Sequence, residues 1–128
     1  MPEQKHEAIK DRLELIASWL HEKKAKDIVA FDLKGVTSFT EGMVIATANS
    51  ARQTKALCDW ILIQGKERGE AALGVEGKDG GQWILVDFND VVVHIFQKDV
   101  RELYNIEGLF TGVTRIDLGF REKKDDSK

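Results

Sequence analysis

Cysteines and long hydrophobic segments are scarce in this sequence, and both absences exclude something. Cys58 is the single cysteine among 128 residues, so no disulfide can form within the chain and nothing indicates an oxidising compartment. No apolar run approaches the roughly 20 residues that cross a bilayer, and residues 1–10 are too polar for a signal peptide. We therefore expect a cytoplasmic protein with no membrane partner.

Positive charge is not in excess either. The chain has 19 lysine and arginine residues against 22 aspartate and glutamate residues, which gives a formal net charge of −3 at pH 7. Proteins that hold nucleic acid through its phosphates usually concentrate basic residues on one surface. Direct nucleic-acid binding is therefore disfavoured, and a mildly acidic surface suits a basic protein partner better.

What the sequence does contain is enough hydrophobic material for one folded domain. Hydrophobic residues make up 42% of the chain and charged residues of both signs 32%, which is typical of a globular protein. We expect one domain over residues 1–110, followed by a C-terminal arm and a flexible charged tail over residues 111–128. In the arm, the alternation of Ile116, Leu118 and Phe120 favours an extended segment along the domain.

The spacing of hydrophobic residues predicts an α+β fold. Residues 42–48 are apolar on both faces, as in an interior strand, and Ser50 with Gln53 has the spacing of a helix-capping box. The last predicted helix has Val100, Leu103 and Tyr104 on one side. The predicted strands cover residues 27–33, 42–48, 73–76, 83–88 and 91–97, and the predicted helices cover residues 6–23, 51–68 and 98–110.

The two strands over residues 83–88 and 91–97 are predicted to form a tight hairpin. Asn89 and Asp90 between them tolerate the positive φ that a two-residue turn needs. One face of this hairpin is then purely apolar. The other face pairs large apolar groups with polar ones: Trp83 with Phe96, Leu85 with His94, and Asp87 with Val92. Such a face is either covered by a helix or used for binding, and a tryptophan near carboxylates suits a binding hot spot.

No arrangement of residues indicates a catalytic site. The histidines have no metal-ligand spacing between them, and His94, inside a strand, is expected to be structural. Cys58 shares an apolar helical face and has no activating neighbour. We therefore expect no enzyme activity and no cofactor. The alternatives are a metal-dependent enzyme related to nucleotidyltransferases, built on Asp32, Asp87 and Asp90, and a homodimeric interaction module.

Ordered blocks of the sequence resemble the ribosomal silencing factor family, also called Iojap-like. The most specific block is WILVDFNDVVVHIFQ over residues 83–97, followed by Arg101, Tyr104 and Glu107. Shorter blocks precede it in the family's order: Ser38-Phe39-Thr40 with Val44-Ile45, residues 47–53 and residues 74–77. The resemblance covers about residues 13–110.

This resemblance implies both a fold and a function. The fold is a mixed sheet flanked by helices, similar in shape to nucleotidyltransferases but without their catalytic residues. The function is to bind the fourteenth protein of the large ribosomal subunit on the surface that faces the small subunit. Bound there, the protein blocks subunit joining sterically and represses translation when nutrients are scarce. Without the ribosome, it is expected to form homodimers.

The resemblance also assigns partner contacts residue by residue. Trp83 matches a family tryptophan at the ribosomal-protein contact, and the segment after the hairpin matches the C-terminal helix motif. The partner-binding residues expected on this basis are Trp83, Tyr104, Glu107, Leu109 and Phe110, with Arg101, Glu76 and Asp87 as further polar contacts.

Three positions depart from the family pattern. Asn89 replaces a usual glycine, Gly42 replaces a larger side chain, and Phe110 stands where tryptophan is common. The change at Phe110, together with residues 111–128, leaves the detail of that edge open while the expected fold is unaffected.

Overall fold

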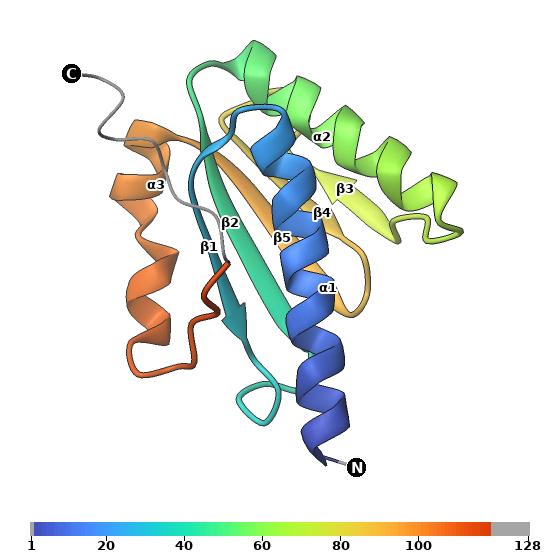
Figure 1. The fold of residues 1–128 in the computed structure, drawn as a ribbon. Coiled ribbons are helices and arrows are strands. Elements are labelled where there is room, and N and C mark those ends of the chain that lie inside the picture. The colour runs from blue at the N-terminus through green and yellow to red at the C-terminus, as the bar shows by residue number, and fades with distance from the viewer. Residues whose placement is uncertain (1, 119–128) are drawn as a thin grey trace, which may run out of the picture.

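The computed structural model describes the backbone of residues 2–118 and the side chains of residues 8–118. Its sheet has five strands in the order β1-β2-β5-β4-β3; β2 and β5 run parallel and the other neighbours antiparallel. The expected α+β fold with a mixed sheet is therefore confirmed (Figure 1). In chain order the elements are α1 (Pro2–Glu22), β1 (Lys26–Asp32), β2 (Gly42–Ala48), α2 (Ala51–Glu67), β3 (Gly74–Glu76), β4 (Trp83–Asp87), β5 (Val91–Gln97), α3 (Lys98–Tyr104) and the 3-10 helix η1 (Ile106–Phe110).

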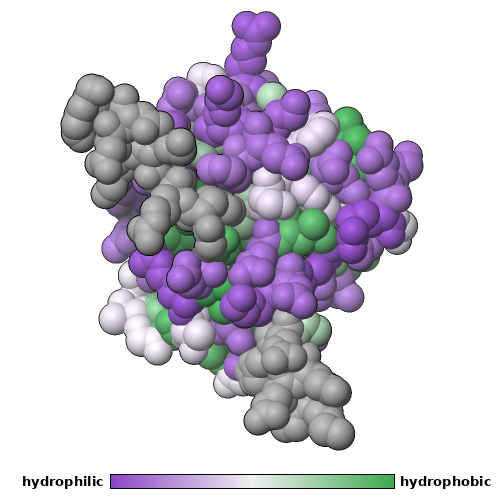
Figure 2. Space-filling model, viewed as in Figure 1, coloured by the Kyte–Doolittle hydropathy of each residue, from purple (hydrophilic) through white to green (hydrophobic). Residues whose placement is uncertain are grey.

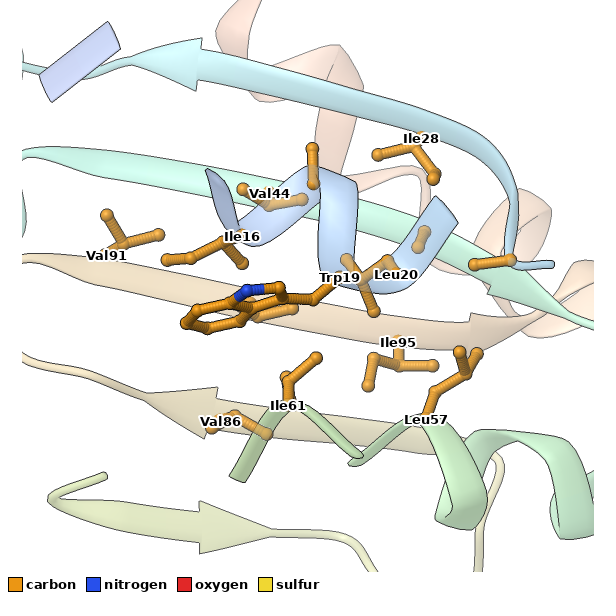
Figure 3. Packing of buried hydrophobic residues seen from close by; sticks show 14 of the residues in the cluster. Ile16, Trp19, Leu20, Ile28, Val44, Leu57, Ile61, Val86, Val91 and Ile95 are labelled. Carbon is orange, nitrogen blue, oxygen red and sulfur yellow. The ribbon is translucent and has the colours of Figure 1, made fainter. Parts of the chain in front are cut away.

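Helices α1 and α2 cover one face of the sheet with their hydrophobic stripes, and the core lies between them and the strands. Trp19 of α1 is 4% exposed and packs on Phe88 in an edge-type arrangement, with a centroid distance of 6.4 Å and an interplanar angle of 67°. The outer surface in this view is mostly hydrophilic, with only small hydrophobic areas (Figure 2). This core between the two helices and the sheet is called the first cluster. Figure 3 labels ten of its residues: Ile16, Trp19, Leu20, Ile28, Val44, Leu57, Ile61, Val86, Val91 and Ile95.

Gly42 begins β2 where α1 comes very close to the sheet. A Cβ atom at Gly42 would lie 2.8 Å from Cδ2 of Leu13, whose side chain is fully buried. Leu13 therefore occupies the space that a larger residue would need. This close packing of α1 on β2 accounts for the glycine at a position where the family pattern favours a larger side chain.

The opposite face of the sheet carries a second, smaller hydrophobic cluster. Side chains of α3, η1 and the segment after η1 pack on it: Val100, Ile106, Phe110 and Val113. Together they cover the part of this face that is formed mainly by β1 and β2. The buried members of the second cluster are Val29, Phe31, Leu33, Met43, Ile45 and Phe96.

One predicted element is wrong, because residues 98–110 form two short helices instead of one. Helix α3 ends at Tyr104, since Asn105 takes a left-handed conformation with φ 45° and ψ 52°. The N–H of Asn105 closes the last turn by donating to the carbonyl oxygen of Arg101 at 2.8 Å. Asparagine enters this conformation more easily than most residues. The chain then turns into η1, whose Ile106 and Phe110 side chains pack on the second cluster.

Helix α2 begins with the capping box that the sequence predicts. Oγ of Ser50 accepts a hydrogen bond from the backbone N–H of Gln53 at 3.1 Å. The Gln53 side chain reaches back and accepts from the N–H of Asn49 at 2.6 Å, one residue before the cap. Two backbone donors at the start of the helix are thus satisfied.

Residues after η1 lie along the free edge of β1. The N–H of Asp32 donates to the Thr114 carbonyl oxygen at 3.0 Å, and the N–H of Ile116 donates to the Ala30 carbonyl oxygen at 2.9 Å. Ile116 and Leu118 pack against the first cluster. These bonds join the arm to the sheet as far as the described residues reach. Phe120 and the charged run over residues 121–128 lie outside them.

Candidate partner-binding face

The hairpin of β4 and β5 has the register that the sequence predicts. Trp83 pairs with Phe96, Leu85 with His94 and Asp87 with Val92. In the turn, Asn89 alone takes a positive φ, of 81°, and its N–H donates to Oδ1 of Asp87 at 2.8 Å. The turn thus uses one left-handed residue, and Asn89 is the residue that replaces the usual glycine.

The second face of the sheet remains partly uncovered over β3, β4 and β5. Glu76 of β3 pairs with Leu85 of β4 and therefore shares its face. The uncovered residues are named the open face: Glu76, Trp83, Leu85, Asp87 and Val92. Glu76 is exposed, and the other four side chains are half-buried.

Trp83 is half-buried, so it is neither sealed in the core nor free of it. Its ring lies 4.8 Å from the ring of Phe96 and 5.0 Å from the ring of Tyr104, between centroids. Its indole N–H donates to Nδ1 of His94 at 3.0 Å. The helix expected as one alternative covers part of the ring, through Tyr104 of α3, and the remaining surface is accessible.

His94 is a structural residue of this face, as its position in a strand predicts. It is 7% exposed, and burial lowers its pKa to about 4. Its ring stacks on that of Phe96 at a centroid distance of 6.0 Å and an interplanar angle of 14°. The ring is therefore neutral at pH 7, and Nδ1 keeps the lone pair that accepts from Trp83.

Arg101 and Glu107 form a clamp inside the chain. Arg101 is 9% exposed, and its Nε and Nη2 donate to the two carboxylate oxygens of Glu107, each at 2.8 Å. Nη1 of Arg101 donates to the Asp27 carbonyl oxygen and to Oγ1 of Thr47, each at 2.7 Å. The hydrogen bonds from Arg101 lower the pKa of Glu107. The clamp holds α3, η1 and the sheet together, and a contact of either residue with a partner stays a prediction.

The other expected contacts lie in different surroundings. Tyr104 is 57% exposed and joins Trp83, whereas Leu109 is 78% exposed on η1. Phe110 is half-buried and packs on Phe31 at a ring-centroid distance of 5.8 Å. Leu103, 76% exposed, was not among the expected contacts. Its spacing from Val100 predicts that both residues lie on the same side of the helix. Only the observed packing of α3 shows that Leu103 faces solvent.

The acidic residues on which an enzyme would depend are engaged in hydrogen bonds within the chain. Oδ1 of Asp32 accepts from the N–H of Lys34, and Asp87 accepts from the turn. Asp90 accepts from Arg12 Nε at 2.9 Å. Within residues 8–118, no group of three or more histidine, cysteine, aspartate or glutamate side chains could hold a metal ion. Burial raises the pKa of the Cys58 thiol, which keeps it protonated at neutral pH.

Comparison with known proteins decides the family. The family model described as "Ribosomal silencing factor during starvation" matches residues 6–128. The chain belongs to the ribosomal silencing factor family. A ribosomal silencing factor from Haemophilus influenzae is 40% identical over 98 residues, which cover 77% of this chain and 96% of that protein. The role in the family's name is regulatory rather than enzymatic.

Solved and more distant members of the family support this placement. A crystal structure of a Chromobacterium violaceum protein superposes with a TM-score of 0.74 at 36% identity, covering 91% of this chain and 95% of that one. A mouse protein named "Mitochondrial assembly of ribosomal large subunit protein 1" is 28% identical over 109 residues, and the match covers 83% of this chain and 48% of the mouse protein.

Among the helices that the structure describes, none is long and apolar enough to cross a membrane.

Proposed function

We propose that this protein is a cytoplasmic translation repressor that binds a protein of the large ribosomal subunit through its open face and α3. The partner implied by the sequence resemblance is the fourteenth protein of that subunit. A domain seated on the joining surface excludes the small subunit by its volume, so repression needs no catalysis and no cofactor.

The observation that carries this proposal is the chemistry of the open face. A half-buried tryptophan and two half-buried aliphatic residues, Leu85 and Val92, lie beside the carboxylates of Glu76 and Asp87. Exposed Tyr104 extends the aromatic surface from Trp83. An aromatic anchor within a polar rim is the usual composition of a binding hot spot, and the acidic rim suits a basic protein.

Family membership adds the ribosome to this picture. The bacterial relatives are named as ribosomal silencing factors, and the mouse relative is named for assembly of the large ribosomal subunit. A large-subunit protein is therefore the partner that best fits both the names and the acidic aromatic face. Free in solution, the same face is proposed to pair with a second copy of the chain, which would also cover its apolar residues.

Binding of Trp83→Ala to isolated large ribosomal subunits tests the proposal. The truncation should cost about 2 kcal/mol of binding free energy, roughly thirty-fold in affinity, because it removes the central aromatic anchor. The matched control is Ile63→Ala, which truncates an exposed hydrophobic residue of α2 that is 49% exposed. Cosedimentation of Trp83→Ala at the wild-type level would refute the proposed docking face.

Two further measurements separate the alternatives. Self-association without any binding to large subunits would leave only a homodimeric module. Heat of binding with Mg²⁺ and a nucleotide in calorimetry is expected only from the enzyme alternative.

A further inference from the structure

The orientation of the Trp83 ring depends on a bond within the chain. Trp83 and His94 are diagonal neighbours on adjacent antiparallel strands and share one face of the sheet. The indole N–H is the ring's only polar group and can only donate. It donates to Nδ1 of His94 at 3.0 Å, a normal length for a hydrogen bond.

The aromatic neighbours of Trp83 do not fix its orientation in the same way. Phe96 and Tyr104 contact the ring at tilts of 30° and 45°. Such contacts are broadly compatible with an indole turned over in its place, because apolar ring contacts are less directional than a hydrogen bond. The bond to His94 is directional and selects one of the two orientations.

The acceptor is itself rigid and correctly protonated. His94 is 7% exposed and stacked on Phe96, so its ring has little freedom to turn. With Nδ1 as the acceptor, the proton of the neutral ring is on Nε2. Burial also lowers the pKa of His94 to about 4, which keeps the ring neutral at pH 7.

We propose that His94 is a positioning residue for partner binding: its Nδ1 atom holds the Trp83 indole in the orientation that docks. This inference rests on the proposed function, to which it adds a residue that does not need to touch the partner. Fixing the ring in advance spares part of the ordering cost at the moment of binding.

The first test uses the free protein. The Trp83 indole N–H signal in a ¹H–¹⁵N spectrum is the one that Trp83→Phe removes. In His94→Leu, this N–H should exchange with solvent at least about fivefold faster, the change that one ordinary hydrogen bond supports. In His94→Asn, the amide oxygen can take the place of Nδ1 as acceptor for the indole N–H. This variant should therefore restore slow exchange.

The second test measures affinity for isolated large ribosomal subunits. His94→Leu should bind about fivefold more weakly than wild type, and His94→Asn should bind within about twofold of it. In a Trp83→Phe background, which has no indole N–H, the substitution of His94 by leucine should have little further effect. Thermal melting shows whether His94→Leu is folded. If it is not, the test uses Trp83→Phe and His94→Asn instead.

The outcomes separate this inference from the function on which it rests. Unchanged indole exchange in His94→Leu, or equal loss of affinity in the His94→Asn and His94→Leu variants, would overturn the positioning role alone. Full additivity of His94→Leu with Trp83→Phe would do the same. Failure of the wild-type protein to bind large subunits would overturn both the proposed function and the positioning role.

Discussion

Replacing Arg101 by methionine should destabilise the fold markedly, because Arg101 ties three elements together. Its guanidinium bonds reach the Asp27 carbonyl oxygen in β1, the Thr47 hydroxyl in β2 and the Glu107 carboxylate in η1. Methionine matches the aliphatic part of the side chain and removes all of these bonds. The substitution therefore isolates the polar contribution of the clamp.

The size of the effect follows from the surroundings of each bond. Removing one partner of a buried ion pair typically costs about 3 to 5 kcal/mol. The Glu107 side chain is 27% exposed and can regain water, which places this case near the lower end. We expect a loss of about 3 kcal/mol in the free energy of unfolding. Glu107→Gln leaves the more buried charge, that of Arg101, without its carboxylate and keeps a single acceptor oxygen, so it should cost a similar amount, about 3 kcal/mol.

Urea denaturation followed by circular dichroism measures both variants. With a slope of about 2 kcal/mol per molar urea, Arg101→Met should lower the midpoint by about 1.5 M and leave the slope unchanged. A midpoint within about 0.25 M of wild type would refute the reasoning, since the buried bonds would then contribute nothing measurable.

Two further predictions concern His94 and the open face. The pKa of His94 is about 4 in the folded chain against about 6.5 in the unfolded chain. Between these pH values the unfolded state binds more protons than the folded state. The free energy of unfolding should therefore fall as the pH drops from about 6.5 to about 4, by up to roughly 3 kcal/mol. Urea midpoints measured across that range should fall more steeply in wild type than in His94→Leu, and parallel curves would contradict the assignment. Glu76→Lys places a positive charge on the acidic rim and should slow association with large subunits roughly tenfold at low salt, an effect that shrinks as salt screens it. Stopped-flow association at two salt concentrations measures this, and equal rates for variant and wild type at low salt would exclude an electrostatic role for Glu76.

Much of the fold could be predicted because local patterns and long-range packing agree. The two-residue turn at Asn89 and Asp90 predicted the hairpin register, because a tight turn sets which residues of the two strands lie opposite each other. The apolar run from Gly42 to Ala48 identified an interior strand, which is buried along its whole length. Ser50 marked the start of α2 through its own side chain.

The parts that could not be predicted depend on contacts between distant residues. The break at Asn105 leaves no strong local signal, because an asparagine is also tolerated inside a helix. The turn there is held in place by the clamp between Arg101 and Glu107. In the same way, the family resemblance placed Arg101 among the expected polar contacts but did not reveal that its charge is used within the chain. How far Tyr104 covers Trp83 likewise depends on where α3 docks.

A photo-cross-linking residue in place of Leu85 tests the docking face most directly. Leu85 lies at the centre of the open face, between Glu76 and His94 across the strands. With isolated large ribosomal subunits, a cross-linker at Leu85 should join the chain to a ribosomal protein, whereas one at Ile63 on α2 should not. Efficient cross-linking from Ile63 and none from Leu85 would contradict the central claim that the sheet's uncovered face meets the ribosome.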